Sequence, residues 1–498
     1  MRLSPRSLFK LVRHPTVTLA IGLGLSGAAG SAFLAIINAS FPHDTAGSQS
    51  VLALSGLNFL LATIVTGMMA GSEQEVARQV TKAAALGQDP ALVVRKQSRH
   101  AAWLIGGTML ATCLLSPVLV SRSLGHNWVL FGELLIGLVG GLAIFPIRGV
   151  LTGRRDYPLF SGTLIVEGLT RLIPGVLVLV LGLGSVWLYG LVFALGGPTL
   201  AAVFGVLAPR WSGRDGYTTA TAYAREEQAR ARDRAEVPAG IEVEFSAGAP
   251  AAAEPGDTAS AAGAAEPERS GTRLSLLTAA SLANQLLFNA IPLLVAARYD
   301  SGAHVTTQMA NKAAAVNSAV GLTRLGILIL VPLQAPLLPR LTAAAVHRRY
   351  AEVRARTRVL TALCAGVALF AAACAWLIGP WVLKNIMRAH DVLPGGYLAV
   401  LTLGTGCIMV AMIIQSTLLA LERHFVVLIA WCVGVAVTVP VFLAGNRLLV
   451  TTAVAAVVGP FVTMVVMAVD AWIHTRGVGA GPLPAPAPQE SDERAAVR

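Results

Sequence analysis

The chain has few charged residues for its length. Of its 498 residues, 13% are charged and 55% are apolar, and the mean hydropathy is +0.67. Soluble globular proteins carry about 25% charged residues, so this composition excludes an ordinary soluble protein. Apolar runs of about 20 residues, long enough to cross the hydrocarbon core as helices, recur along the sequence. The sequence therefore predicts an all-α polytopic membrane protein.

Motifs for catalysis, metals and cofactors are also missing. No DxD and no GxxxxGK[ST] occurs, and the turns predicted to face outward are too short to build a catalytic domain. These absences argue against a membrane glycosyltransferase or polymerase, and we expect neither an enzyme nor a cofactor. The cysteines show no CxxC or Cys/His spacing, so we expect no metal site and no disulfide. All five lie inside apolar runs: Cys113, Cys364, Cys374, Cys407 and Cys432.

The net charge of +12 does not indicate a nucleic-acid partner, because the basic residues lie in turns between apolar runs. Most of the 38 lysines and arginines fall in the two terminal segments and in the turns after even-numbered spans. By the positive-inside rule, we expect a multi-pass plasma-membrane protein with both termini in the cytoplasm. Twelve spans are predicted, near 16–41, 48–71, 100–121, 128–147, 157–181, 186–208, 274–297, 313–337, 359–379, 394–420, 425–444 and 449–473.

A segment rich in Ala, Pro, Gly and Glu divides the spans six and six. Such a composition is typical of disorder, so the segment is predicted to be a linker. The turn GVLTGRRDYPLF (149–160) aligns without gaps on TLLALERHFVVL (417–428), which indicates two six-helix lobes related by a parallel pseudo-two-fold repeat. The predicted parts are an N-lobe (1–208), a largely disordered cytoplasmic linker (209–272), a C-lobe (273–475) and a disordered tail (476–498).

Charged side chains inside the predicted spans are the first candidates for function, because charge is costly in the bilayer. Glu167 and Arg171 share a helix face at i, i+4, and Arg324 lies in the other half of the chain. Arginine binds phosphate oxygens in a bidentate manner, so Arg171 and Arg324 are substrate-binding candidates, one in each lobe. Glu167 is a coupling-ion candidate. The alternative is structural: Glu167 pairs only with Arg171, and Arg324 bonds backbone carbonyls.

The seventh span adds a polar face. Asn284, Gln285 and Asn289 are candidates for binding sugar hydroxyls, with hydrogen bonding between helices as the alternative. Pro292, which follows them, is predicted to kink the span and to contribute to gating.

Two other acidic positions have alternative interpretations. Glu75 and Arg78, just beyond the second span, form an i, i+3 pair that is either solvated or a gating contact. Glu133 is interpreted as an interfacial residue at the outer start of the fourth span.

The pattern RGVLTGRRDYPLF…EGLTRL (148–172) and the segment GSEQEVARQV (71–80) resemble polysaccharide-biosynthesis proteins of the oligosaccharidyl-lipid flippase type. These belong to the multidrug/oligosaccharidyl-lipid/polysaccharide exporter superfamily. The resemblance implies a V-shaped pair of lobes that alternate between inward-open and outward-open states. It also implies a cargo, a polyprenyl-(pyro)phosphate-linked oligosaccharide, that is flipped from the inner to the outer leaflet.

The partners that follow from this resemblance are the lipid-linked glycan, the bilayer and glycan-assembly enzymes. Two alternatives within the superfamily are a cation-coupled multidrug antiporter and a lipid II flippase. The lipid II flippase is the less favoured of these alternatives, because lipid II flippases commonly carry two C-terminal spans beyond the twelve predicted here. The excess of deep arginine over spare acid favours an anionic cargo over a drug cation.

Overall fold

The structure is a computed structural model in which α-helices account for nearly all of the described chain, and no strand occurs in that part. Ten helices are long and apolar enough to cross a membrane, or eleven if a bent pair counts as one span. The described residues are 15–85, 90–154, 156–211, 267–299, 305–327, 341 and 349–476.

Within the described residues, the N-terminal half contains eight α-helices and one π-helical turn. Their bounds are α2 Pro15–Ser40, α3 Thr45–Ala85, α4 Pro90–Leu114, α5 Ser116–Ser123, α6 Trp128–Gly153, α7 Tyr157–Val180, α8 Val186–Ala194, η1 Leu195–Thr199 and α9 Leu200–Trp211. The C-terminal half contains α11 Pro267–Tyr299, α12 Thr307–Thr323, the 3₁₀ turn η2 Arg324–Gly326, α15 Tyr350–Asn385, α16 Gly395–Ala420, α17 His424–Ala444 and α18 Leu448–Arg476.

Helix packing repeats between the two halves. The first span of the N-lobe, α2, packs against the fifth, α7, and α11 packs against α17 in the same way in the C-lobe. The fourth span of each lobe likewise packs against the sixth, α6 against the α8–α9 segment and α16 against α18. The predicted pseudo-two-fold repeat of six-helix lobes is thus confirmed.

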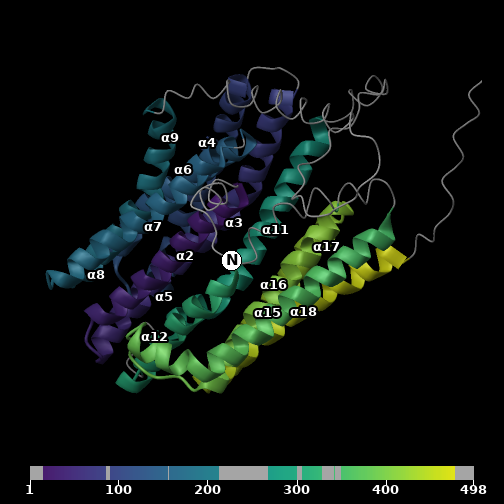
Figure 1. The fold of residues 1–498 in the computed structure, drawn as a ribbon. Helices are drawn as coiled ribbons and strands as arrows, with labels where there is room; N and C mark the ends of the chain where they lie inside the picture. The colour runs from purple at the N-terminus through teal and green to yellow at the C-terminus, as the bar shows by residue number, and fades with distance from the viewer. Residues whose placement is uncertain are drawn as a thin grey trace, which may run out of the picture.

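The lobes are joined mainly by α3 and α11, which lie side by side (Figure 1). Figure 1 also shows the helices of the two lobes converging towards the end that carries α12 and α5, and diverging towards the opposite end. We call the first the sealed end, because the turn at 41–44 and the loop at 386–394 meet there across the lobes. The opposite end, where α9 stops and α11 starts, is the linker end.

Two predicted spans are broken by proline. The third is bent by 65° between α4 and α5, where Pro117 occupies the first turn of α5 and supplies no backbone N–H. The sixth contains the π-helical turn η1, which includes Pro198. The sequence analysis had given each of them as a single span, and the lack of a proline N–H accounts for the breaks.

Parts of the predicted organisation lie outside the described residues. They include 212–266 of the linker, 477–498 of the tail, Arg155 of the repeated turn and most of the inner half of the eighth span. Helix α9 runs to Trp211 and α11 begins at Pro267, so helix overlaps both ends of the predicted linker. The domain boundaries stay a prediction.

Candidate functional site

Arg324 lies at a break in the eighth span, next to the other lobe. Helix α12 ends at Thr323, and Arg324 begins the 3₁₀ turn that ends at Gly326. The sequence had predicted a continuous helix through this position. The break turns the half-buried arginine side chain towards α11 and α3, whose groups surround it.

Pro292 explains one of the contacts of Arg324. In an α-helix the N–H of residue i donates to the carbonyl of residue i−4, and proline has no N–H. Pro292 therefore leaves the carbonyl of Phe288 without its helical donor in α11. Arg324 supplies the missing donor, because its Nη2 donates to Phe288 O. An unpaired carbonyl at membrane depth costs several kcal/mol, so this contact stabilises α11.

Asn289 fixes the other side of the same guanidinium. Its Oδ1 accepts from Arg324 Nη1 at 2.7 Å, and its Nδ2 donates to the Gln285 carbonyl at 3.1 Å. Asn289 is completely buried and Asn284 is nearly so. The amide of Asn289 is thus occupied by protein groups here, and sugar binding by Asn284, Gln285 and Asn289 stays a prediction.

Two aromatic rings, one from each lobe, lie against the guanidinium. The Arg324 Cζ lies 4.1 Å from the ring centroid of Phe288 on α11 and 4.8 Å from that of Phe59 on α3. Both distances allow cation–π attraction. Among the described residues no carboxylate forms an ion pair with Arg324. A net positive charge therefore remains at the interface between the lobes.

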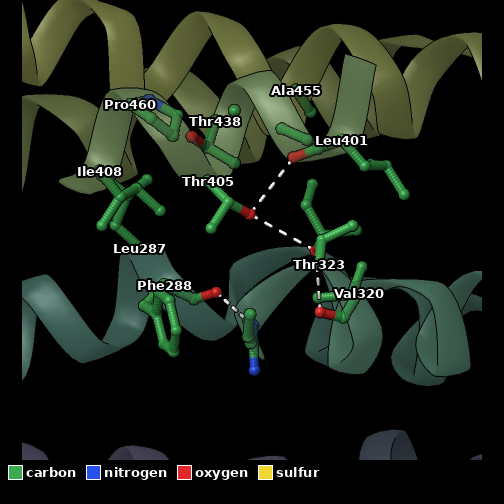
Figure 2. Close-up of a pocket in the computed structure, with 14 residues that line it drawn as sticks. Leu287, Phe288, Val320, Thr323, Leu401, Thr405, Ile408, Thr438, Ala455 and Pro460 are labelled. Carbon is green, nitrogen blue, oxygen red and sulfur yellow. Dashed lines mark hydrogen bonds between the residues drawn. The ribbon is translucent and has the colours of Figure 1, made fainter. Parts of the chain in front are cut away.

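A small cavity adjoins Arg324 on the C-lobe side. Its volume is about 30 Å³, which is room for about two water molecules. Its walls are mostly apolar, with the hydroxyl groups of Thr323, Thr405 and Thr438 as polar groups beside Arg324 (Figure 2). Thr405 Oγ1 lies 3.4 Å from Thr323 Oγ1 and 3.3 Å from Leu401 O, and its single proton is donated to one of them at a time. The site thus joins a cation to a mostly apolar wall, and the cavity is too small in this conformation for a larger molecule.

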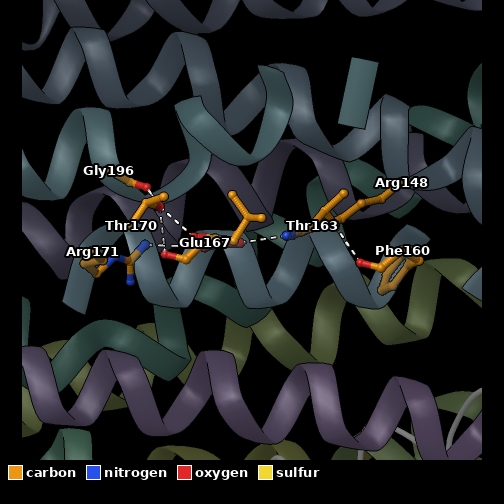
Figure 3. Close-up of polar contacts among 8 residues, drawn as sticks. Arg148, Phe160, Thr163, Glu167, Thr170, Arg171 and Gly196 are labelled. Carbon is orange, nitrogen blue, oxygen red and sulfur yellow. Dashed lines mark hydrogen bonds and ion pairs between the residues drawn. The ribbon is translucent and has the colours of Figure 1, made fainter. Parts of the chain in front are cut away.

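A second arginine cluster lies inside the N-lobe (Figure 3). Glu167 accepts from Arg148 Nη2 at 2.7 Å through Oε2 and from Arg171 Nη2 at 3.3 Å through Oε1. Arg148 Nε also donates to Thr163 Oγ1 at 3.1 Å. One carboxylate therefore serves two guanidinium groups.

The part played by Arg148 corrects the sequence interpretation, which had assigned it to the inner turn after the fourth span. Arg148 is 7% exposed, and helix α6 continues beyond it to Gly153. The signal was present in the sequence, because GVL after Arg148 continues the apolar run. Arg171 and Arg324 had been taken as the two deep arginines, and Arg148 is a third.

Arg171 is held by the π-helical turn of the sixth span. Its Cζ lies 4.3 Å from the Phe193 ring centroid, and Thr170 Oγ1 donates to Gly196 O. A Cβ atom on Gly197 would lie 2.4 Å from Arg171 Nη2, so glycine leaves room for the guanidinium. Arg171 Nε is buried and has no hydrogen-bond partner among the described residues. An unused donor on a buried cation fits a site that receives an acceptor in another state.

The structure does not bring Arg171 and Arg324 together. Arg171 contacts Glu167 and Phe193 within the N-lobe, whereas Arg324 contacts α11 and α3. A clamp made by both arginines on one phosphate group stays a prediction. Ion coupling at Glu167 also stays a prediction, and in this conformation the Glu167 carboxylate has two arginine partners.

The remaining acidic candidates lie apart from both clusters. Glu75 Oε1 accepts from Arg78 Nη2 at 2.7 Å near the linker end of α3, with the Arg78 side chain 63% exposed. A gating role for this pair stays a prediction. Glu133, near the start of α6, is only 4% exposed, and its interpretation as a residue at the membrane interface stays a prediction. The carboxyl packs on Gly190, which has no side chain to exclude it, and Oε2 has no hydrogen-bond partner.

The link between Pro292 and Arg324 gives a testable coupling. Arg324→Gln removes the charged donor to Phe288 O, whereas Pro292→Ala restores a backbone donor to the same oxygen. We expect Arg324→Gln to lower the free energy of unfolding by about 1 kcal/mol less in the Pro292→Ala background than in the unmodified protein. This difference is the net contribution of one hydrogen bond. Thermal unfolding of the four proteins in detergent measures the coupling. Pro440→Ala in α17 is the matched control, and equal coupling with this proline would contradict the assignment.

Comparison with known proteins identifies the fold. No protein-family model and no curated protein matches the chain. Solved structures do match over nearly the whole length. A transporter of the MOP superfamily from Pyrococcus furiosus, described as having a binding pocket of reverse polarity, matches at a TM-score of 0.59 and 14% identity, covering 93% of this chain and 95% of the other.

Two further matches are a multidrug resistance MATE family transporter of the same superfamily in two conformations. The outward-facing structure matches at a TM-score of 0.57 and 12% identity, covering 93% of this chain and 95% of the other. The inward-facing structure matches at 0.54 and 16%, covering 95% and 96%. The chain therefore has the fold of MATE-type transporters of the MOP superfamily.

Proposed function

We propose that this protein is a transporter that flips a polyprenyl-(pyro)phosphate-linked oligosaccharide from the inner to the outer leaflet by alternating access of its two lobes. The observation that carries the proposal is Arg324, a cation without an ion-pair partner among the described residues, between the lobes and beside an apolar cavity. A guanidinium with free donors matches phosphate oxygens, and apolar walls tolerate a lipid.

The structural relatives support transport by this architecture. They include inward-facing and outward-facing structures of one transporter type, and the fold of this chain aligns with both. The relative from Pyrococcus furiosus is described as having a pocket of reverse polarity suggesting a different function, so charge in the pocket varies on this fold. Among the described residues no group of three or more His, Cys, Asp or Glu side chains is placed to hold a metal.

Charge distribution supports an orientation. The turns after even-numbered spans hold most of the basic residues, and the described parts of these turns lie at the linker end. With the linker end in the cytoplasm, the sealed end faces outward in this conformation. The plasma membrane, the two cytoplasmic termini and glycan-assembly enzymes as partners belong to the same proposal.

Binding measurements test the choice of cargo. Purified protein in nanodiscs is titrated with a polyprenyl pyrophosphate, with the corresponding polyprenyl alcohol and with a lipophilic cation. We expect the pyrophosphate to bind about tenfold or more tightly than the alcohol, because charge-assisted hydrogen bonds contribute roughly 1.5–3 kcal/mol. Arg324→Gln should remove this preference. Arg423→Gln, which breaks a half-exposed ion pair with Asp470 at the linker end, should retain it.

A cation-coupled multidrug antiporter is the second candidate, and Glu133 favours it. A deeply buried carboxyl with an unpartnered oxygen is the kind of group that carries a proton or cation in transporters. Tight binding of the lipophilic cation, with no preference for pyrophosphate over alcohol, would support the antiporter and contradict the flippase.

A further inference from the structure

The sealed end is closed by a buried polar cluster to which both lobes contribute. Asn38 and Ser48 come from the N-lobe, on either side of the turn at 41–44. Ser318 on α12 and His390 in the loop at 386–394 come from the C-lobe. All four are at most 6% exposed. Polar groups buried to this degree need hydrogen-bond partners, and here the partners belong to opposite lobes.

Three polar contacts link Asn38 to the other lobe. Asn38 Nδ2 donates to Ser318 Oγ and to Met387 O, both at 2.9 Å. The backbone carbonyl of Asn38 lies 3.2 Å from His390 Nε2. When the lobes separate at this end, these contacts break together.

Asn311, Ser48, His390 and Asn38 form a chain of polar contacts. When the His390 imidazole is neutral, this chain has one hydrogen fewer than the number of contacts. Asn311 Nδ2 donates to the His43 carbonyl, so Asn311 Oδ1 faces Ser48 and accepts the Ser48 hydroxyl proton. Ser48 Oγ is then an acceptor for His390 Nδ1 at 2.6 Å. The carbonyl of Asn38 is also only an acceptor, so both ring nitrogens of His390 face acceptors. A neutral imidazole donates to one of them, and the contact to Asn38 is the longer one.

The surroundings of His390 oppose a second proton. The His43 ring stacks on the His390 ring with centroids 4.3 Å apart, so a charge on either ring repels a charge on the other. Burial is the largest cause that lowers the pKa of the His390 imidazole, from 6.5 to about 4, followed by His43. The hydrogen bond to Asn38 and the carboxylate of Asp44 act in the opposite direction and are weaker. The other charged neighbours in sequence are Lys312 on α12, and Arg388 and Asp391 in the loop at 386–394.

We propose that His390 is a proton-binding site that couples opening of the sealed end to proton uptake. In the closed state the imidazole is neutral and donates from Nδ1 to Ser48. When the lobes separate, Nε2 no longer faces the Asn38 carbonyl, becomes hydrated and takes up a proton from the bulk solvent. The resulting imidazolium must lose this proton before the sealed end closes again. This inference rests on alternating access in the proposed function and is independent of the cargo.

The sign and size of the effect follow from the two protonation states. A group with a pKa near 4 in the closed state and near 6.5 in water binds more protons when the end is open. Acid therefore shifts the equilibrium towards the open state, between about pH 6.5 and pH 4. Between pH 7.5 and pH 5 the ratio of open to closed protein should rise about 30-fold.

Distance measurement by electron spin resonance tests the proposal without any cargo. The five native cysteines are replaced by alanine, and spin labels are placed at the exposed positions Arg122 and Asn446, one in each lobe at the sealed end. In nanodiscs the long-distance population should grow as the pH falls from 7.5 to 5. His390→Gln should remove this dependence. His126→Asn, at an exposed histidine of the same end, should retain it.

Two results would overturn the proposal. One is a distance distribution in the labelled protein with native His390 that does not change between pH 7.5 and pH 5, which needs no variant. The other is a pH response of equal size after His390→Gln or, if that variant fails to fold, after His390→Asn. Loss of cargo binding in the Arg324 variants leaves these distances unaffected, so failure of the proposed function is distinguished from failure of this inference.

Discussion

Arg324→Gln is expected to slow flipping of a lipid-linked oligosaccharide by about 100-fold. The guanidinium donates to Asn289 Oδ1 and Phe288 O and lies between two aromatic rings, which leaves three of its five N–H groups for a ligand. Losing charge-assisted hydrogen bonds to a phosphate group costs roughly 1.5–3 kcal/mol, which corresponds to about 10- to 100-fold. The rate is measured in proteoliposomes with a fluorescent lipid-linked glycan and matched protein incorporation.

Lysine at the same position separates charge from geometry. Arg324→Lys keeps the positive charge but loses the planar pair of donors, so we expect an intermediate loss of about tenfold. Arg423→Gln is the control for the loss of an arginine at the linker end. If Arg324→Gln flips the glycan at the rate of the unmodified protein, Arg324 does not bind the cargo and the proposed function loses its main support.

Glu167→Gln is expected to lower the free energy of unfolding by about 3–5 kcal/mol. The carboxylate neutralises part of the charge of two buried arginines, at 2.7 Å and 3.3 Å. Removing one partner of a buried ion pair leaves an uncompensated buried charge, which is the costly case. Chemical unfolding in detergent, followed by tryptophan fluorescence, measures the change.

Two further variants show whether charge is the cause. Adding Arg148→Gln to Glu167→Gln removes one of the two unpaired charges and should recover about half of the loss. Glu75→Gln, in a pair whose arginine is largely exposed, should cost less than about 1 kcal/mol. Equal destabilisation by Glu75→Gln and Glu167→Gln would show that burial of the N-lobe cluster contributes little.

The fold class could be predicted from the sequence because long apolar runs indicate membrane-spanning helices. The candidate residues were also found, because a charged side chain inside an apolar run is conspicuous. The local helix geometry and the contacts of these residues could not be predicted from the sequence. The break at Arg324 depends on contacts with α11 and α3, and nothing in the local pattern GLTRLGI ends the helix there. Arg148 was misplaced because a charge near a span end was taken as the end of the helix.

The cluster around His390 was beyond sequence reasoning for a different reason. Its members are individually ordinary polar residues of helix ends, a helix interior and a loop, and Asn38 and Met387 are separated by 349 positions. Only the approach of the two lobes brings them together. The same holds for Phe59 and Phe288, which gain a common partner in Arg324 through packing of α3 against α11.

The contact between Arg324 and the Phe288 carbonyl has a thermodynamic consequence for transport. A phosphate group that attracts the guanidinium competes with Phe288 O, and α11 then loses the donor that compensates for Pro292. Ligand binding and the bending stiffness of α11 are thereby linked, and such linkage is reciprocal. A ligand that engages Arg324 softens α11 at Pro292, and any influence that bends α11 there raises the affinity of Arg324 for anions. The cargo would thus help to loosen the helix that joins the two lobes.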